Sequence, residues 1–95
     1  MLLKTHGGER MRQWRYGLIG CGRFGAFCLE QLSGWDRLRP VAATDSVRAV
    51  AEATAEKFNL SASATVADLL GRSDVDLVLI STPPDSHHAL ALQCL

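Results

Sequence analysis

Short apolar runs along this chain alternate with stretches in which apolar residues recur at helical spacing. Apolar side chains dominate residues 16–19, 40–44 and 75–80, where Asp76 is the single exception in the last run. Continuous apolar runs of this length are typical of parallel strands that are covered on both faces. With a short extended piece at 61–64, the pattern predicts four strands.

The stretches between these runs predict helices. The first should begin at Phe24 and end at Ser33–Gly34. Its expected inner face is Phe24, Phe27, Cys28, Gln31 and Leu32. The second should cover 46–58 and end at Asn59, an acceptable left-handed residue. A capping-box pair, Thr65 and Asp68, predicts a short third helix that ends at Gly71. A fourth is expected over 87–95.

Strands and helices that alternate in this way imply right-handed crossovers and a parallel sheet. The fold class is therefore α/β: a Rossmann-like parallel sheet with helices on both faces, incomplete, with about four strands. In chain order the strands should lie 3-2-1-4 across the sheet, which leaves a crevice between the first turn and residues 81–84. Residues 1–13 lack periodicity and are expected to be a flexible leader, and 14–95 the N-terminal part of a dinucleotide-binding domain.

The composition limits the kinds of partner that can be expected for this protein. The chain has 95 residues, enough for one small domain, and its 47% hydrophobic and 21% charged content is that of an ordinary globular protein. Ten basic and ten acidic residues balance, which gives no electrostatic reason to expect nucleic acid or an anionic membrane as partner. No apolar run approaches the roughly 20 residues that span a bilayer.

The cysteines point to a reducing environment. Cys21, Cys28 and Cys94 are an odd number and contain no Cys-x-x-Cys pair, which argues against a disulfide framework and against a structural metal site. We expect a cytoplasmic protein without a metal, in which these cysteines are packing residues.

The first strand runs into a Gly-x-Gly-x-x-Gly spacing at Gly20, Gly22 and Gly25. The first glycine suits a tight turn, the second lets a diphosphate approach the backbone, and the third lets the helix pack on the strand. Amides at the start of the helix would then bind the diphosphate. The spacing is weak evidence by itself, because eight glycines can produce it by accident.

An acidic residue supports the dinucleotide interpretation. Asp45 follows the second strand about 20 residues after the third glycine, where a carboxylate binds the adenosine ribose hydroxyls. The alternative is that Asp45 only caps the next helix. The carboxylate favours NAD, since it would repel a 2′-phosphate, although Arg48 could offset part of that repulsion and leave NADP as a second cofactor.

Three segments together resemble a known family. They are Gly-Leu-Ile-Gly-Cys-Gly-Arg-Phe-Gly at 17–25, Val-Ala-Ala-Thr-Asp at 41–45, and Thr-Pro-Pro-x-x-His at 82–87. The chain resembles, from about residue 16 onward, the N-terminal domain of the Gfo/Idh/MocA oxidoreductases, which include glucose-fructose oxidoreductase and inositol dehydrogenase. The third segment is the most discriminating of the three.

The resemblance implies an NAD(P)-dependent enzyme that moves hydride between nicotinamide and a sugar, inositol or related polyol or carbonyl substrate. It implies cofactor contacts at the turn (Gly20, Cys21, Gly22, Arg23, Phe24, Gly25), at Asp45, and, near the nicotinamide-side ribose, at Ser81, Thr82, Pro83, Pro84 and His87. The family's catalytic lysine and substrate domain would follow Leu95. No catalytic residue is therefore assigned, and these 95 residues alone are expected to be inactive, with any homo-oligomer formed through the missing domain.

Two non-enzymatic alternatives remain open at this point. A nucleotide-sensing regulatory domain shares the strand, the glycine turn and the acid, although it would not be expected to carry Thr-Pro-Pro-x-x-His. An interaction module could have kept the fold and lost the ligand. The substrate and the hydride face are not specified by the residues.

Overall fold

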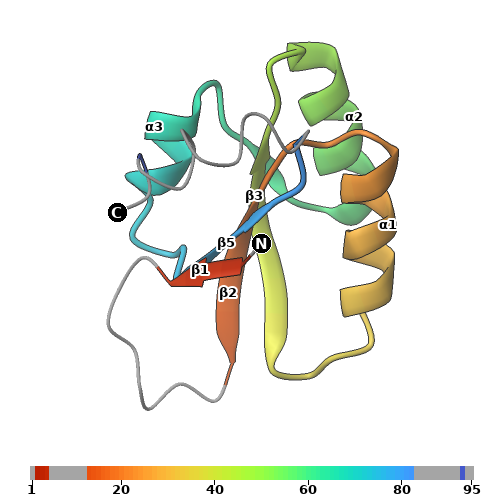
Figure 1. Ribbon diagram of the computed structural model, residues 1–95, viewed down its shortest axis with the longest axis vertical. Coiled ribbons are helices and arrows are strands. Elements are labelled where there is room, and N and C mark those ends of the chain that lie inside the picture. The colour runs from red at the N-terminus through yellow and green to blue at the C-terminus, as the bar shows by residue number, and fades with distance from the viewer. Residues whose placement is uncertain (1, 5–12, 83–92, 94–95) are drawn as a thin grey trace.

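The computed structural model describes residues 2–4, 13–82 and 93. Within these residues it has one β-sheet and three helices (Figure 1). The elements are β1 (Leu2–Lys4), β2 (Trp14–Ile19), α1 (Arg23–Leu32), β3 (Leu38–Thr44), α2 (Arg48–Phe58), β4 (Ser61–Ala62), α3 (Val66–Leu70) and β5 (Leu77–Ile80). The helix expected over 87–95 lies outside the described residues.

The strands lie in the order β1-β5-β2-β3-β4. Strands β5, β2, β3 and β4 are parallel to their neighbours, which confirms the Rossmann-like class and the order expected for the four predicted strands. In the centre of the sheet Leu18 lies between Ala43 and Leu79. This order brings the carboxyl ends of β3, β2 and β5 to one edge.

The first residues of the chain differ from the expected leader. Leu2–Lys4 forms β1, which pairs antiparallel with β5, with Leu3 opposite Val78. The expectation of a leader without regular structure is wrong for these three residues. An edge strand such as β5 exposes unpaired amides and carbonyls that another extended segment can satisfy, a long-range pairing that local periodicity does not reveal.

Helices cover both faces of the sheet, as expected. Helices α1 and α2 lie on one side and α3 on the other (Figure 1). The α1/α2 side contains a cluster of buried residues: Tyr16, Leu18, Cys21, Leu29, Ala43 and Ala51. The α3 side contains a second cluster: Ile19, Ala42, Leu69, Val75, Val78 and Ile80. Because both sides are covered, β2 and β5 read as continuous apolar runs.

Helix α1 presents a different face to the sheet from the one expected. Its buried residues are Gly25 and Leu29, whereas the Phe24 and Phe27 side chains are 61% and 55% exposed and stack on each other with ring centroids 6.4 Å apart. Gly25 must face the preceding turn, and each helical residue is rotated by about 100° from the one before it. Phe24 is therefore turned outward, and the predicted inner face is wrong for both phenylalanines.

The predicted helix ends are confirmed. Asn59 follows α2 in the left-handed conformation, with φ of 59°. The Thr65 side chain accepts a hydrogen bond from the Asp68 amide at 3.0 Å, and Gly71 follows α3. These local signals were readable because capping involves only residues near in sequence.

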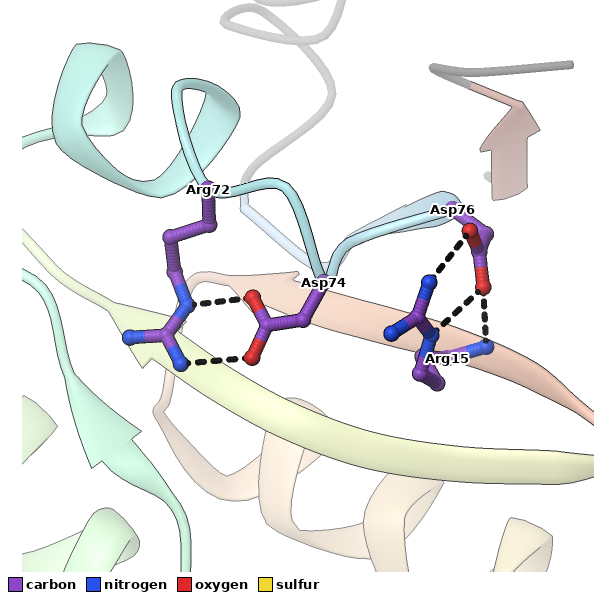
Figure 2. A network of polar contacts seen from close by, with 4 residues as sticks. All are labelled: Arg15, Arg72, Asp74 and Asp76. Carbon is purple, nitrogen blue, oxygen red and sulfur yellow. Dashed lines mark hydrogen bonds and ion pairs between the residues drawn. The ribbon is translucent and has the colours of Figure 1, made fainter.

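Two Arg–Asp pairs lie where the chain enters β2 and β5 (Figure 2). The buried Asp76 carboxylate accepts bonds from the Arg15 amide at 2.9 Å and from the Arg15 guanidinium at 3.0 and 3.2 Å. The Asp76 amide in turn donates to the Arg15 carbonyl at 2.8 Å. Arg72 binds Asp74 through two bonds of 2.8 Å and lowers the pKa of that carboxyl. The one polar residue of the predicted fourth strand thus fixes the start of β5 against β2.

Candidate cofactor site

The glycine turn lies between β2 and α1, at the edge where the parallel strands end. Asp45 follows β3 and Ser81 follows β5, so residues of three neighbouring strand ends meet at the turn. This is the edge at which open α/β sheets bind ligands. The structure brings together these predicted site residues: Gly20, Cys21, Gly22, Arg23, Phe24, Gly25, Asp45, Ser81 and Thr82. Pro83, Pro84 and His87 lie outside the described residues.

Two of the three glycines are required by the chain's own packing. Gly20 has a φ of +97°, and a Cβ atom there would lie 2.9 Å from the Thr82 methyl group. A Cβ atom on Gly25 would collide with the Gly20 carbonyl oxygen. Both positions therefore exclude a side chain whether or not a ligand binds.

Gly22 has no such explanation. A Cβ atom there would meet nothing within 4 Å, and its φ of −70° suits any residue. A side chain would instead project into the space in front of the helix. The geometry fits a ligand that must approach this backbone closely, which is the use of the second glycine in dinucleotide sites.

The start of α1 offers amides to an anion. Gly22 is the N-cap and makes no side-chain cap bond, and the first turn contains no acidic residue. The first amides of a helix have no partner within the helix, and the helix dipole is positive there. Arg23 and Phe24 are exposed on the same turn. A phosphate group could satisfy these amides without displacing a side chain.

Asp45 faces the glycine turn. One carboxylate oxygen accepts from the Cys21 amide at 2.7 Å, and the other accepts from the Val47 amide at 2.8 Å. The second contact is a local turn two residues ahead and does not cap α2, whose N-cap is Val47 and which has no side-chain cap bond. Both contacts exist together, and each oxygen keeps a lone pair that a ribose hydroxyl could use.

Cys21 is a packing residue. Its side chain is buried in the cluster under α1 and α2, and its thiol lies 3.4 Å from the Thr44 carbonyl oxygen. Burial, followed by the nearby Asp45 charge, raises the pKa of the Cys21 thiol to about 11. At neutral pH the group is a neutral thiol, and nucleophilic chemistry at this position is not favoured.

Sequence reasoning missed two contacts that hold the turn. The Ser81 hydroxyl donates to the Gly20 carbonyl at 2.5 Å, so it points into the turn and not toward a crevice. Thr54 of α2 is buried and its hydroxyl lies 3.5 Å from the Cys21 carbonyl oxygen. Both contacts join residues far apart in the chain, and no local pattern signals them. On the surface of α2, Arg48 binds Glu52 at 3.0 Å, four residues further along the helix.

Other kinds of site find no support in the described part of the chain. Over residues 2–4, 13–82 and 93, no group of three or more histidine, cysteine, aspartate or glutamate side chains could hold a metal ion. In that same part, none of the helices has the length and apolar character needed to cross a membrane.

A protein-family model matches residues 14–95 of the chain. The matching family is Gfo/Idh/MocA, described as an oxidoreductase family with an NAD-binding Rossmann fold. The chain belongs to this family. The resemblance seen in the sequence is confirmed, and these residues form an NAD-binding oxidoreductase domain.

Individual Gfo/Idh/MocA proteins are similar over most of the chain. Inositol 2-dehydrogenase of Rhizobium meliloti is 37% identical over 73 residues, which are 77% of this chain and 22% of that protein. A Desulfitobacterium hafniense structure named as an NADPH-dependent oxidoreductase has a TM-score of 0.85 and 26% identity, covering 88% of this chain and 24% of that one. The WlbA dehydrogenase of Chromobacterium violaceum, in complex with NADH and UDP-GlcNAcA, has a TM-score of 0.76 and 28% identity. The match covers 90% of this chain and 25% of that one. The chain thus spans about a quarter of these relatives.

Proposed function

We propose that this chain is the NAD-binding part of an oxidoreductase that transfers hydride between nicotinamide and a sugar, inositol or related polyol or carbonyl substrate. Membership of the Gfo/Idh/MocA family supports the cofactor class, and the similarity to an inositol 2-dehydrogenase supports the substrate class. The nicotinamide supplies the hydride chemistry when it is bound. The residues of this chain bind and orient the dinucleotide, and none is assigned a catalytic role.

The absence of any atom within 4 Å of a Cβ built on Gly22 is the observation that carries the proposed cofactor site. Contacts within the chain exclude a side chain at the two other glycines, whereas the Gly22 backbone is open to a close approach from outside. The diphosphate would lie there against the amides of Gly22, Arg23 and Phe24. Asp45, fixed against the same turn, would accept hydrogen bonds from the adenosine ribose.

Asp45 is also the basis for preferring NAD to NADP. Two like charges about 4 Å apart repel by on the order of 4 kcal/mol at an effective dielectric constant of 20. Arg48, which could offset that repulsion, is bound to Glu52 one turn further along α2. This pair is exposed and weak, so Arg48 remains able to offset part of the repulsion, and the expected preference for NAD is moderate.

Titration calorimetry tests this proposal. The whole chain is titrated with NAD, NADH and NADP, with circular dichroism to verify that the sample is folded. Heat from NAD and NADH with weaker or no heat from NADP is the expected result. A folded sample that gives no heat with any dinucleotide would contradict the proposal and favour an interaction module. Binding of NAD without any change of nicotinamide absorbance on addition of polyols, in a protein that includes the substrate domain, would favour a nucleotide sensor.

A further inference from the structure

One peptide group of the glycine turn is held at both of its ends by side chains from two different strand ends. The carbonyl oxygen of the Gly20–Cys21 peptide accepts a hydrogen bond from the Ser81 hydroxyl at 2.5 Å. The N–H of the same peptide donates to the Asp45 carboxylate at 2.7 Å. Ser81 follows β5 and Asp45 follows β3, so the two neighbours of β2 hold this peptide from opposite sides.

The segment that follows β5 lies close against this peptide. A Cβ atom on Gly20 would lie 2.9 Å from the Thr82 methyl and 3.0 Å from the Ser81 backbone, so the segment after β5 presses directly on the turn. Ser81 is tied to β2 by its own amide as well, which donates to the Ile19 carbonyl at 2.9 Å. The Ser81 side chain is therefore held where its hydroxyl meets Gly20.

The orientation of this peptide determines where the next amides point. Gly22 follows Cys21 directly and opens α1, so a rotation of the Gly20–Cys21 plane would redirect the amides that face the proposed diphosphate. A ligand that binds a turn already held in place does not have to order it, and affinity rises by the ordering cost that is avoided. The serine therefore bears on the affinity for the diphosphate although its hydroxyl points into the protein.

We propose that Ser81 is a positioning residue for the diphosphate site, and that it acts by holding the Gly20 carbonyl and not by contacting the nicotinamide-side ribose. The proposal rests on the cofactor function proposed above. It replaces the role that the family resemblance suggested for this serine. Its hydroxyl proton faces two carbonyl oxygens of the chain, that of Gly20 at 2.5 Å and that of Ile19 at 3.4 Å, so a ribose oxygen would have to displace one of them to accept that proton.

A comparison of two ligands separates the two roles of Ser81. NAD contains both riboses and the diphosphate, whereas ADP contains the diphosphate and lacks the nicotinamide-side ribose. Ser81→Ala should weaken NAD and ADP by the same factor, about tenfold for the loss of one hydrogen bond that orients the turn. Adenosine, which has no phosphate, should lose little affinity. Loss of NAD affinity with unchanged ADP affinity would overturn the proposal in favour of a ribose contact.

Ser33→Ala is the matched control. The Ser33 hydroxyl also donates to a backbone carbonyl, that of Glu30 at 2.7 Å, but it lies at the far end of α1. Ser33→Ala removes the same kind of hydroxyl-to-carbonyl hydrogen bond, and it should leave the affinities for NAD and ADP unchanged. If Ser81→Ala does not fold, Ser81→Cys keeps a weaker donor of similar size and should show a smaller loss with the same equality between NAD and ADP. Unchanged affinity for both ligands in a folded Ser81 variant would contradict the proposal.

An NMR measurement tests the held peptide without any ligand. The Cys21 amide, bound to a carboxylate at 2.7 Å, should exchange slowly with solvent and resonate downfield, and Ser81→Ala should accelerate its exchange. Rapid exchange in the unmodified chain would overturn the positioning role itself. Slow exchange in a chain that binds neither NAD nor ADP would instead contradict the cofactor function, so the two failures can be distinguished.

Discussion

The Gly20 carbonyl oxygen occupies the place that a Gly25 side chain would need. The first turn of α1 therefore packs on the glycine turn without any intervening side chain. Gly22, between the two, has no neighbour within 4 Å of the position its Cβ would take. The same short motif thus contains two glycines that the chain's own packing requires and one, Gly22, whose surroundings are open.

Gly22→Ala should leave the fold intact and weaken dinucleotide binding. The new methyl group meets no atom of the chain but lies where the diphosphate would approach. We expect an unchanged midpoint of thermal unfolding and a loss of NAD affinity of at least tenfold, measured by calorimetry.

Gly34→Ala provides the control for this experiment, because a Cβ atom there also meets nothing within 4 Å and the residue lies beyond the far end of α1. It should change neither stability nor NAD affinity. Gly25→Ala should behave in the opposite way to Gly22→Ala and lower the unfolding midpoint. Equal NAD affinity in Gly22→Ala and the unmodified chain would mean that no ligand approaches this backbone.

Asp45→Ala should weaken NAD more than NADP. For both cofactors, the variant lacks the hydrogen bonds by which the Asp45 carboxylate holds the Cys21 and Val47 amides. NAD also loses the carboxylate as an acceptor for its ribose hydroxyls. For NADP, removal of the negative charge offsets part of the loss. Calorimetric dissociation constants for the two cofactors should show NAD affinity falling about 10–100-fold and the NAD/NADP preference shrinking or reversing.

A suitable control is Glu56→Ala, which removes one exposed negative charge from α2 at a distance from the turn. It should leave the ratio of the two dissociation constants unchanged. If Asp45→Ala weakens NAD and NADP equally, the carboxylate supports the turn and does not distinguish the riboses.

Asp76→Ala should destabilise the sheet more than Asp74→Ala. Asp76 is buried and holds both the amide and the guanidinium of Arg15, whereas Asp74 binds Arg72 in a more exposed pair (Figure 2). Losing charge-assisted bonds of a buried carboxylate costs about 1.5–3 kcal/mol, and an exposed ion pair contributes under about 1 kcal/mol. Urea unfolding of the two variants should show this order, and similar midpoints would contradict it.

Tyr16→Phe should be neutral or stabilising at pH 7. The Tyr16 hydroxyl is fully buried and has no hydrogen-bond partner among the described residues, so its removal relieves an uncompensated desolvation. Burial raises the Tyr16 pKa from 10.0 to about 12. Because the folded state then binds the proton more tightly than the unfolded state, stability should fall as the pH rises from 10 to 12.

Tyr16→Phe should not show the part of the stability loss above pH 10 that comes from ionisation of Tyr16. Thermal unfolding at several pH values between 7 and 12 measures both effects, and the difference in midpoint between the two proteins should widen above pH 10. A Tyr16→Phe variant that is clearly less stable at pH 7 would show that the hydroxyl has a partner.

A feature could be predicted from the sequence when it depends on residues close together in the chain. The strand runs, the glycine spacing, Asn59 and the Thr65–Asp68 cap were readable because each depends on residues close together in the chain. The order of the four parallel strands was also predictable, since right-handed crossovers leave few arrangements. The exposed Phe24 and Phe27 were not, because a hydrophobic stripe does not say which side Gly25 will force toward the turn.

The sequence by itself therefore determined the fold class, the family and the position of the glycine turn, since apolar period and motif spacing are properties of neighbouring residues. Only the tertiary structure decided which glycines the packing requires, that β1 pairs with β5, and that Asp45 and Ser81 hold opposite ends of one peptide group. Each of these depends on the distance between atoms of segments far apart in the chain, and that distance exists only once the sheet has assembled.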